Sequence, residues 1–143
     1  MRLVEAMKAA FFLIFTTSCA FAQSQETPVY VEQFANLQSG MKKIYSECSQ
    51  NPTTAEERLS LSDRLFALTK IVHRLEEQVQ EADLQSRQQG HAIDKRLRLI
   101  EQGSHEVDSV LKALGNYLDT DDRVFWGLAV DFRKTIDTIM KVL

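Results

Sequence analysis

The stretch that decides the fold is LSDRLFALTKIVHRLEEQVQEA, residues 61–82. Its apolar side chains alternate between steps of four and three residues, which places them on one face of a helix. We call these positions the heptad seam: Leu61, Leu65, Leu68, Val72, Leu75, Val79 and Ala82. In heptad terms, Leu65, Val72 and Val79 occupy a positions and the others occupy d positions. The pattern predicts a long helix that buries this seam against other helices.

The residues before the seam predict a separate helix over residues 28–49. Its apolar stripe has helical spacing and consists of Tyr30, Phe34, Leu37, Met41, Ile44 and Cys48. Asn51-Pro52 is expected to end this helix, because the residue before a proline is pushed away from helical geometry. Thr53 and Thr54 each precede a glutamate by three residues, which is the capping-box pattern. The second helix is therefore expected over residues 54–87.

Two further helices are expected after residue 90. Over residues 91–118 apolar side chains again recur by threes and fours, although their stripe is rotated relative to the heptad seam. Asp119-Thr120-Asp121-Asp122 supplies turn and capping chemistry, and a last helix is predicted over residues 121–142. One face of that helix presents Phe125, Leu128, Phe132, Ile136, Ile139 and Leu143. Strict apolar alternation is absent, so the sequence predicts an all-α protein.

The connection at Gln88-Gln89-Gly90 leaves two arrangements open. If it turns, residues 23–143 form a single helical domain, an antiparallel bundle or helical hairpin with coiled-coil heptads. If it stays helical, residues 54–118 form one coiled-coil rod about 100 Å long, at 1.5 Å per residue, with short flanking helices. The rotated stripe and Gly90 favour the turn, which is the interpretation that we adopt.

The first 22 residues have the order of a secretory signal peptide. A short charged start is followed by an apolar run at residues 9–15 and by Ala20-Phe21-Ala22 before Gln23. An apolar run too short to span a membrane, closed by an A-x-A site, is typical of a cleaved export signal. We expect cleavage after Ala22 and a periplasmic or secreted protein. The alternative is a lipoprotein anchored to a membrane through Cys19.

Composition and motifs exclude several classes of function. The chain has 17 Lys and Arg against 20 Asp and Glu, a net charge of −3, without the basic patch that nucleic-acid binding requires. It contains no Gly-rich phosphate loop, haem-attachment motif or nucleophile elbow. In the heptad register, His73, His91 and His105 face away from the seam. The sequence therefore predicts no catalytic residue, no cofactor and no metal site, and a protein that is not an enzyme.

Protein association is the mode of action that remains. The seam residues Leu61, Leu65, Leu68, Val72, Leu75 and Val79 are the candidates for contacts with a partner protein or with a second copy. Trp126 lies beside the stripe of the last helix and is a candidate interface anchor, the alternative being core packing. Cys48 is the only cysteine that follows the signal segment. It is expected either to pack as a buried thiol or to form an intermolecular disulfide.

The segment from Leu75-Glu76-Glu77-Gln78 to Arg98-Leu99-Ile100-Glu101 resembles the coiled coil of periplasmic cell-division coordinators that trimerise beside the Tol–Pal system. The resemblance covers under a third of residues 23–143 and implies a coiled coil; no function is carried over from it. The residues themselves indicate an exported, non-enzymatic scaffold, adaptor or accessory subunit of an envelope assembly. The alternative is a soluble periplasmic bundle that binds a hydrophobic ligand or unfolded protein between its helices.

Overall fold

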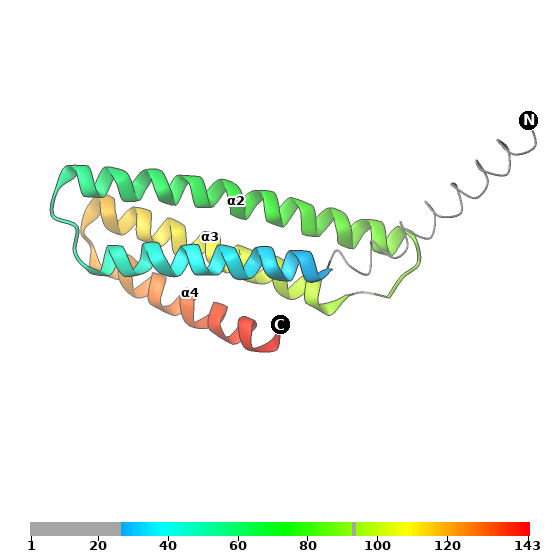
Figure 1. Ribbon diagram of the computed structural model, residues 1–143. Coiled ribbons are helices and arrows are strands. Elements are labelled where there is room, and N and C mark those ends of the chain that lie inside the picture. Colours follow the sequence, from blue (N-terminus) through cyan, green and yellow to red (C-terminus); the bar gives the residue numbers. More distant parts are fainter. Residues whose placement is uncertain (1–26, 93) are drawn as a thin grey trace, which may run out of the picture.

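The computed structural model describes residues 27–92 and 94–143, whose regular structure is entirely helical (Figure 1). An N-terminal helix covers residues 27–49. It is followed by α2 (Ala55–Gln88), α3 (Lys95–Thr120) and α4 (Arg123–Val142). The prediction of an all-α protein is confirmed. The predicted signal peptide, residues 1–22, and Cys19 lie outside the described residues.

Capping chemistry determines where α2 begins. Thr54 is the N-cap residue, and its hydroxyl accepts a hydrogen bond from the Glu57 N–H at 3.1 Å. The Glu57 carboxylate in turn accepts from the Thr53 N–H at 3.2 Å, which is close to the reciprocal bonding of a capping box. In the turn before it, Asn51 has a φ of 53°, a left-handed conformation that Asn tolerates better than most residues. Pro52 then prevents the preceding helix from continuing.

α2 and α3 are separate helices, so residues 54–118 do not form one rod. α2 ends at Gln88, and Gly90 has a φ of 74°, which glycine adopts without steric cost. The Gly90 N–H donates to the Arg87 carbonyl and the His91 N–H to the Ser86 carbonyl, both at 3.0 Å. These bonds satisfy carbonyls of the last turn of α2.

Both predicted starts of the later helices were too early. α3 begins at Lys95, because Asp94 caps it by accepting from the Arg96 N–H at 2.9 Å. α4 begins at Arg123, because Asp122 caps it by accepting from the Val124 N–H at 3.0 Å. An aspartate N-cap is itself non-helical. The helices therefore begin one residue after these aspartates, and not at the predicted residues 91 and 121.

Side-chain contacts show how α2 and α3 lie against each other. Arg58, near the start of α2, donates to the Leu118 carbonyl at the end of α3 at 2.8 Å. Near the other end of α2, the Gln80 amide donates to Glu101, near the start of α3, at 3.2 Å. The two helices lie side by side in Figure 1. The start of one helix therefore lies beside the end of the other.

The N-terminal helix lies beside α3 and α4. Its first described residue, Thr27, donates to the Asp94 carboxylate at 3.0 Å. Just beyond its end, Asn51 accepts from the Tyr117 hydroxyl of α3 at 2.9 Å. Lys42, in its second half, pairs with Asp137 of α4 at 3.7 Å.

α3 is the most buried helix among α2, α3 and α4, with eleven buried residues against six on α2 and three on α4. Gly103 permits its close approach to the N-terminal helix. A Cβ atom at Gly103 would lie 2.5 Å from the Cζ atom of Phe34, whose side chain is fully buried. The core therefore forms around α3, where side chains of all four helices meet.

Candidate protein-interaction surface

The heptad seam packs inside the chain's own core. Leu61, Leu65, Val72, Leu75 and Val79 are each at most 5% exposed, and the half-buried Leu68 and Ala82 pack against the same core. The predicted face of α2 is therefore the buried one. The sequence interpretation had assigned these side chains to contacts with a partner protein. In the folded chain they are buried and are not available to a partner. Heptad spacing indicates burial against another helix, but it does not show which chain supplies that helix.

Trp126 packs against two neighbouring helices. Its ring stacks on Tyr45 of the N-terminal helix, with 4.6 Å between centroids, and lies 5.5 Å from the ring of Tyr117 in α3. The Arg133 guanidinium lies over the Tyr45 ring at 4.7 Å. The remaining exposed part of Trp126 borders a pocket of only ≈ 260 Å³. These contacts favour the core-packing alternative for Trp126 over the role of interface anchor.

Cys48 is a fully buried free thiol. Burial raises the pKa of this thiol to about 11, with a smaller contribution from the negative charge of Glu47. The thiol is therefore protonated at neutral pH, whereas the thiolate is the reactive form. A second chain cannot reach this sulfur in the folded protein, so the predicted intermolecular disulfide disagrees with the structure. Cys48 continues the buried stripe of the N-terminal helix and acts as a small apolar side chain.

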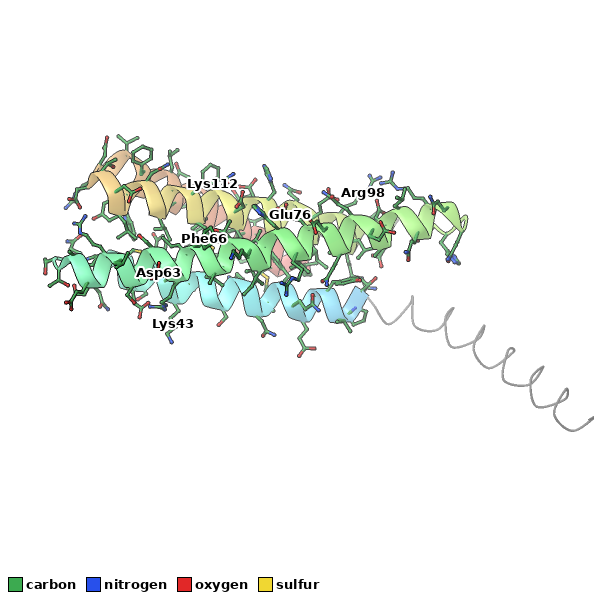
Figure 2. The ribbon with its side chains drawn as sticks, turned by 90° about the horizontal axis from the view of Figure 1, so that it is seen from above. Lys43, Asp63, Phe66, Glu76, Arg98 and Lys112 are labelled. Carbon is green, nitrogen blue, oxygen red and sulfur yellow. The ribbon has the colours of Figure 1, made fainter. Side chains whose placement is uncertain are left out.

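A polar cluster crosses the contact between α2 and α3. The Asp108 carboxylate is nearly buried; Lys112 Nζ lies 2.9 Å from its Oδ2 atom and His73 Nε2 lies 3.3 Å from its Oδ1 atom. Figure 2 shows Glu76 on α2 and Lys112 on the neighbouring α3. The sequence interpretation, in which His73 faces only solvent, missed this contact, because a b position lies at the edge of the helix next to α3.

The polar cluster is a structural contact and not a metal centre. Within residues 27–92 and 94–143, no three His, Cys, Asp or Glu side chains are arranged so that they could hold a metal ion. Lys112 places its ammonium group against the Oδ2 atom of a carboxylate that has lost most of its water, whereas His73 lies beside the Oδ1 atom, which makes no hydrogen bond. A carboxylate buried in this way requires such partners. The cluster therefore aligns α2 with α3.

Glu76 makes the stability of the protein depend on pH. Burial, followed by the nearby charge of Asp108, raises the pKa of the Glu76 carboxyl above its ordinary value of 4.5, whereas His73 and His105 act in the opposite direction. The folded protein therefore binds this proton more tightly than the unfolded chain, and ionisation of Glu76 opposes folding. We expect Glu76→Gln to raise the midpoint of thermal unfolding at about pH 8, because the carboxyl is ionised in the unfolded chain at this pH and its burial then opposes folding.

The gain from Glu76→Gln should disappear at about pH 3.5, because the wild-type carboxyl is then protonated in both states. Circular dichroism at the two pH values measures the difference. Glu77→Gln is the matched control, since Glu77 is an exposed neighbour on the same helix, and it should change little at either pH. An equal shift for Glu76→Gln at both pH values would contradict the assignment.

Two open grooves beside α2 have linings in which polar and apolar surface are about equal. One groove, of ≈ 690 Å³, lies between the N-terminal helix and α2, and its lining includes Gln33, Glu77, Glu81 and Gln85. The other, also ≈ 690 Å³, lies at the turn between these two helices and includes several glutamates and Arg64. Sites for apolar ligands are lined mainly by hydrophobic and aromatic side chains. The grooves therefore do not favour a hydrophobic ligand.

α4 leaves much of its apolar face uncovered. Only Ala129, Ile136 and Ile139 are buried on this helix. Val124, Leu128 and Val142 are 66%, 42% and 67% exposed, and helical periodicity places them on one side of α4. We define the α4 stripe as these three residues together with the half-buried Phe125 and Phe132. The sequence interpretation had grouped Leu128 with Ile136 and Ile139 on one face of this helix; the structure buries the latter two and exposes Leu128.

The large apolar side chains that α2 exposes lie at least five residues apart along the helix: Leu59, Phe66, Ile71 and Leu84. Leu59 and Phe66 are 65% and 63% exposed, and the ring of Phe66 (labelled in Figure 2) is covered on one side by the Lys70 ammonium at 4.5 Å. Isolated apolar residues are ordinary on protein surfaces. The α4 stripe is therefore the best candidate for a protein-interaction surface among the described residues.

Comparison with known proteins returned no protein family, no curated protein and no solved structure that matches this chain. No helix within the described residues is long and apolar enough to span a membrane.

Proposed function

We propose that this protein is an exported, non-enzymatic helical scaffold or adaptor of the cell envelope, with the periplasm as its site of action. In this proposal, residues 23–143 form an antiparallel bundle whose coiled-coil heptads are internal. The contacts of Arg58 and Gln80 with opposite ends of α3 support that topology. The bundle then acts by presenting a helix face to a protein partner.

The α4 stripe is the observation that carries this proposal. Apolar surface that is removed from water contributes about 25 cal/mol per Å², and an apolar face on a helix is complementary to a groove or to another helix. The buried seam of α2 and the buried Cys48 offer no comparable surface. The proposed adaptor function therefore depends on the exposed apolar side chains of α4, which no other helix of the bundle covers.

A photoreactive amino acid at position 128 tests this surface in the exported protein. We expect illumination of intact cells to give discrete protein adducts, because Leu128 lies in the middle of the stripe. The same amino acid at position 59 is the control, since Leu59 is equally apolar and even more exposed at 65% but lies on α2. Absence of adducts at position 128, or the same adducts at both positions, would contradict the proposed surface.

Export is supported by the order of the first 22 residues, in which an apolar run precedes Ala20-Phe21-Ala22. We expect the exported protein to begin at Gln23, as determined by N-terminal sequencing and intact mass. A chain that begins at an acylated Cys19 would establish the lipoprotein alternative. Recovery of the uncleaved chain from the cytoplasm alone would contradict export.

A further inference from the structure

We propose that a small pocket at one end of the bundle binds a neutral, hydroxylated ring of the size of one sugar residue. The pocket, of ≈ 260 Å³, is lined by Ser49, Asn51, Tyr117, Arg123 and Trp126. These residues come from the end of the N-terminal helix and the turn after it, from the last turn of α3 and from the first turn of α4. Figure 1 shows these segments at the same end of the bundle. The α4 stripe is not part of this pocket, so the proposal does not depend on the adaptor function.

Hydrogen bonds and ring stacking hold the walls of the pocket in place. The Tyr117 hydroxyl donates to Asn51 Oδ1 at 2.9 Å, which ties the turn to α3. The Asn51 N–H donates to the Cys48 carbonyl at 3.3 Å. The Trp126 ring stacks on Tyr45 and lies 5.5 Å from the ring of Tyr117. The walls are therefore in position before a ligand binds, which lowers the entropic cost of binding.

The side chains of the pocket offer both hydrogen-bond acceptors and donors. The hydroxyl hydrogens of Tyr117 and Ser49 are already used within the chain, because they are donated to Asn51 and to the Ser46 carbonyl. The two hydroxyl oxygens can therefore only accept from a ligand, whereas Asn51 Nδ2 and the Arg123 guanidinium can only donate. Within residues 27–92 and 94–143, neither of these donors has an acceptor. A ligand hydroxyl both donates and accepts, so it satisfies both kinds of group.

The surrounding charges disfavour an anionic ligand. Arg123 is the only charged residue among the five that line the pocket. However, Asp119, Asp121 and Asp122 are exposed and lie within four residues of it in the chain, and Arg58 pairs with only one of them, Asp121. An anion would be attracted by Arg123 and repelled by these carboxylates. A neutral ligand forms its hydrogen bonds without that opposition.

The aromatic walls and the size of the pocket favour a single sugar ring. The faces of aromatic rings carry partial negative charge, and the C–H groups of a sugar ring carry partial positive charge, so they pack well on Tyr117 and Trp126. The pocket is smaller than the about 300–1,000 Å³ of most small-molecule sites, which limits the ligand to about one ring. A ligand of about 12 non-hydrogen atoms is expected to bind with a dissociation constant of about 1–10 mM.

The NMR signal of the Trp126 indole N–H tests the proposal, because Trp126 is the only tryptophan of the chain. Methyl β-glucoside, methyl β-galactoside and N-acetylglucosamine are each added to the purified protein up to about 50 mM, above the expected dissociation constant. We expect at least one sugar to shift this signal saturably. Glycerol, which has hydroxyl groups but no ring, should not. No saturable shift with any of the three sugars, or tighter binding of benzoate than of every sugar, would overturn the proposal.

Two substitutions test the location of the site. Asn51→Gly removes the amide and keeps the left-handed backbone conformation, and should weaken sugar binding by about three- to tenfold. Arg123→Ala removes the exposed guanidinium at the start of α4 and should weaken it by about tenfold or more. Arg98→Ala is the matched control, since Arg98 (labelled in Figure 2) is an exposed arginine in the first turn of α3, outside the pocket.

The Arg98→Ala variant should bind sugar like the wild type, and circular dichroism verifies that all three variants are folded. Wild-type binding by both Asn51→Gly and Arg123→Ala would overturn the assignment to this pocket. Failure of the sugar titration leaves the adaptor proposal standing, because photo-cross-linking at position 128 tests a different surface.

Discussion

Leu75→Asp should abolish stable folding, or lower the free energy of unfolding by more than about 4 kcal/mol. Leu75 is 3% exposed at the centre of the heptad seam. The substitution loses the transfer free energy of a buried leucine, about 2 kcal/mol, and places a carboxylate without a partner in an apolar core. Because small domains have total stabilities of about 5–15 kcal/mol, much of the protein should be unfolded. Circular dichroism and urea titration measure the loss.

Leu84→Asp is the matched control for Leu75→Asp. It makes the same chemical change on the same helix, but Leu84 is 49% exposed and lies outside the seam. Its effect should stay within about 0.5 kcal/mol, as for most surface substitutions. Similar losses for the two variants would show that the buried face of α2 has been assigned incorrectly.

Gly103→Ala should destabilise the protein by about 1–3 kcal/mol, although alanine is the better helix former. A Cβ atom there would lie 2.5 Å from Phe34 Cζ and 2.9 Å from Phe34 Cε2. The Phe34 ring is fully buried and cannot turn away without disturbing the core, because protein interiors are closely packed. Chemical denaturation of the variant and the wild type gives the difference in the free energy of unfolding.

Gly115→Ala provides the comparison within the same helix. No atom lies within 4 Å of a Cβ built at Gly115, so only helix propensity acts and the variant should gain about 0.5–1 kcal/mol. Replacing the Phe34 ring with a shorter side chain, in Phe34→Leu, should recover part of the free energy of unfolding that Gly103→Ala loses, since the two sites are in contact. Stabilisation by Gly103→Ala alone would mean that α3 and the N-terminal helix do not approach as closely as described.

Local chemistry accounts for what could be predicted about the helices. Thr54 with Glu57, and the Asn51-Pro52 pair, mark the boundary before α2 through interactions between residues close in the chain. The predicted start of this helix, residue 54, therefore lies within one residue of the observed start, Ala55. Asp94 and Asp122 act in the same way. Before α4, three aspartates (Asp119, Asp121 and Asp122) are candidates for the N-cap, whereas Asp94 is the only aspartate between residues 84 and 107 and was not recognised as the cap of α3. The starts of α3 and α4 were therefore predicted too early.

The candidate site was not predictable to the same degree. Periodicity marks the apolar face of α4, including Leu128, but it cannot show how much of that face other helices cover. α4 buries only three residues where α3 buries eleven, and this difference depends on the position of each helix in the bundle. The exposed α4 stripe therefore became visible only in the folded chain.

The sequence by itself determined that this protein is helical and which face of α2 is buried, and it favoured a turn near Gly90 over a continuous rod. Helix caps, periodicity and backbone conformation act over a few residues, so the chain carries that information locally. Only the tertiary structure decided that the heptad seam is internal, that Trp126 stacks on Tyr45 and Tyr117, and that His73 meets Asp108. These facts depend on which helices become neighbours, and packing between residues far apart in the chain sets that choice. The same packing leaves the α4 stripe exposed.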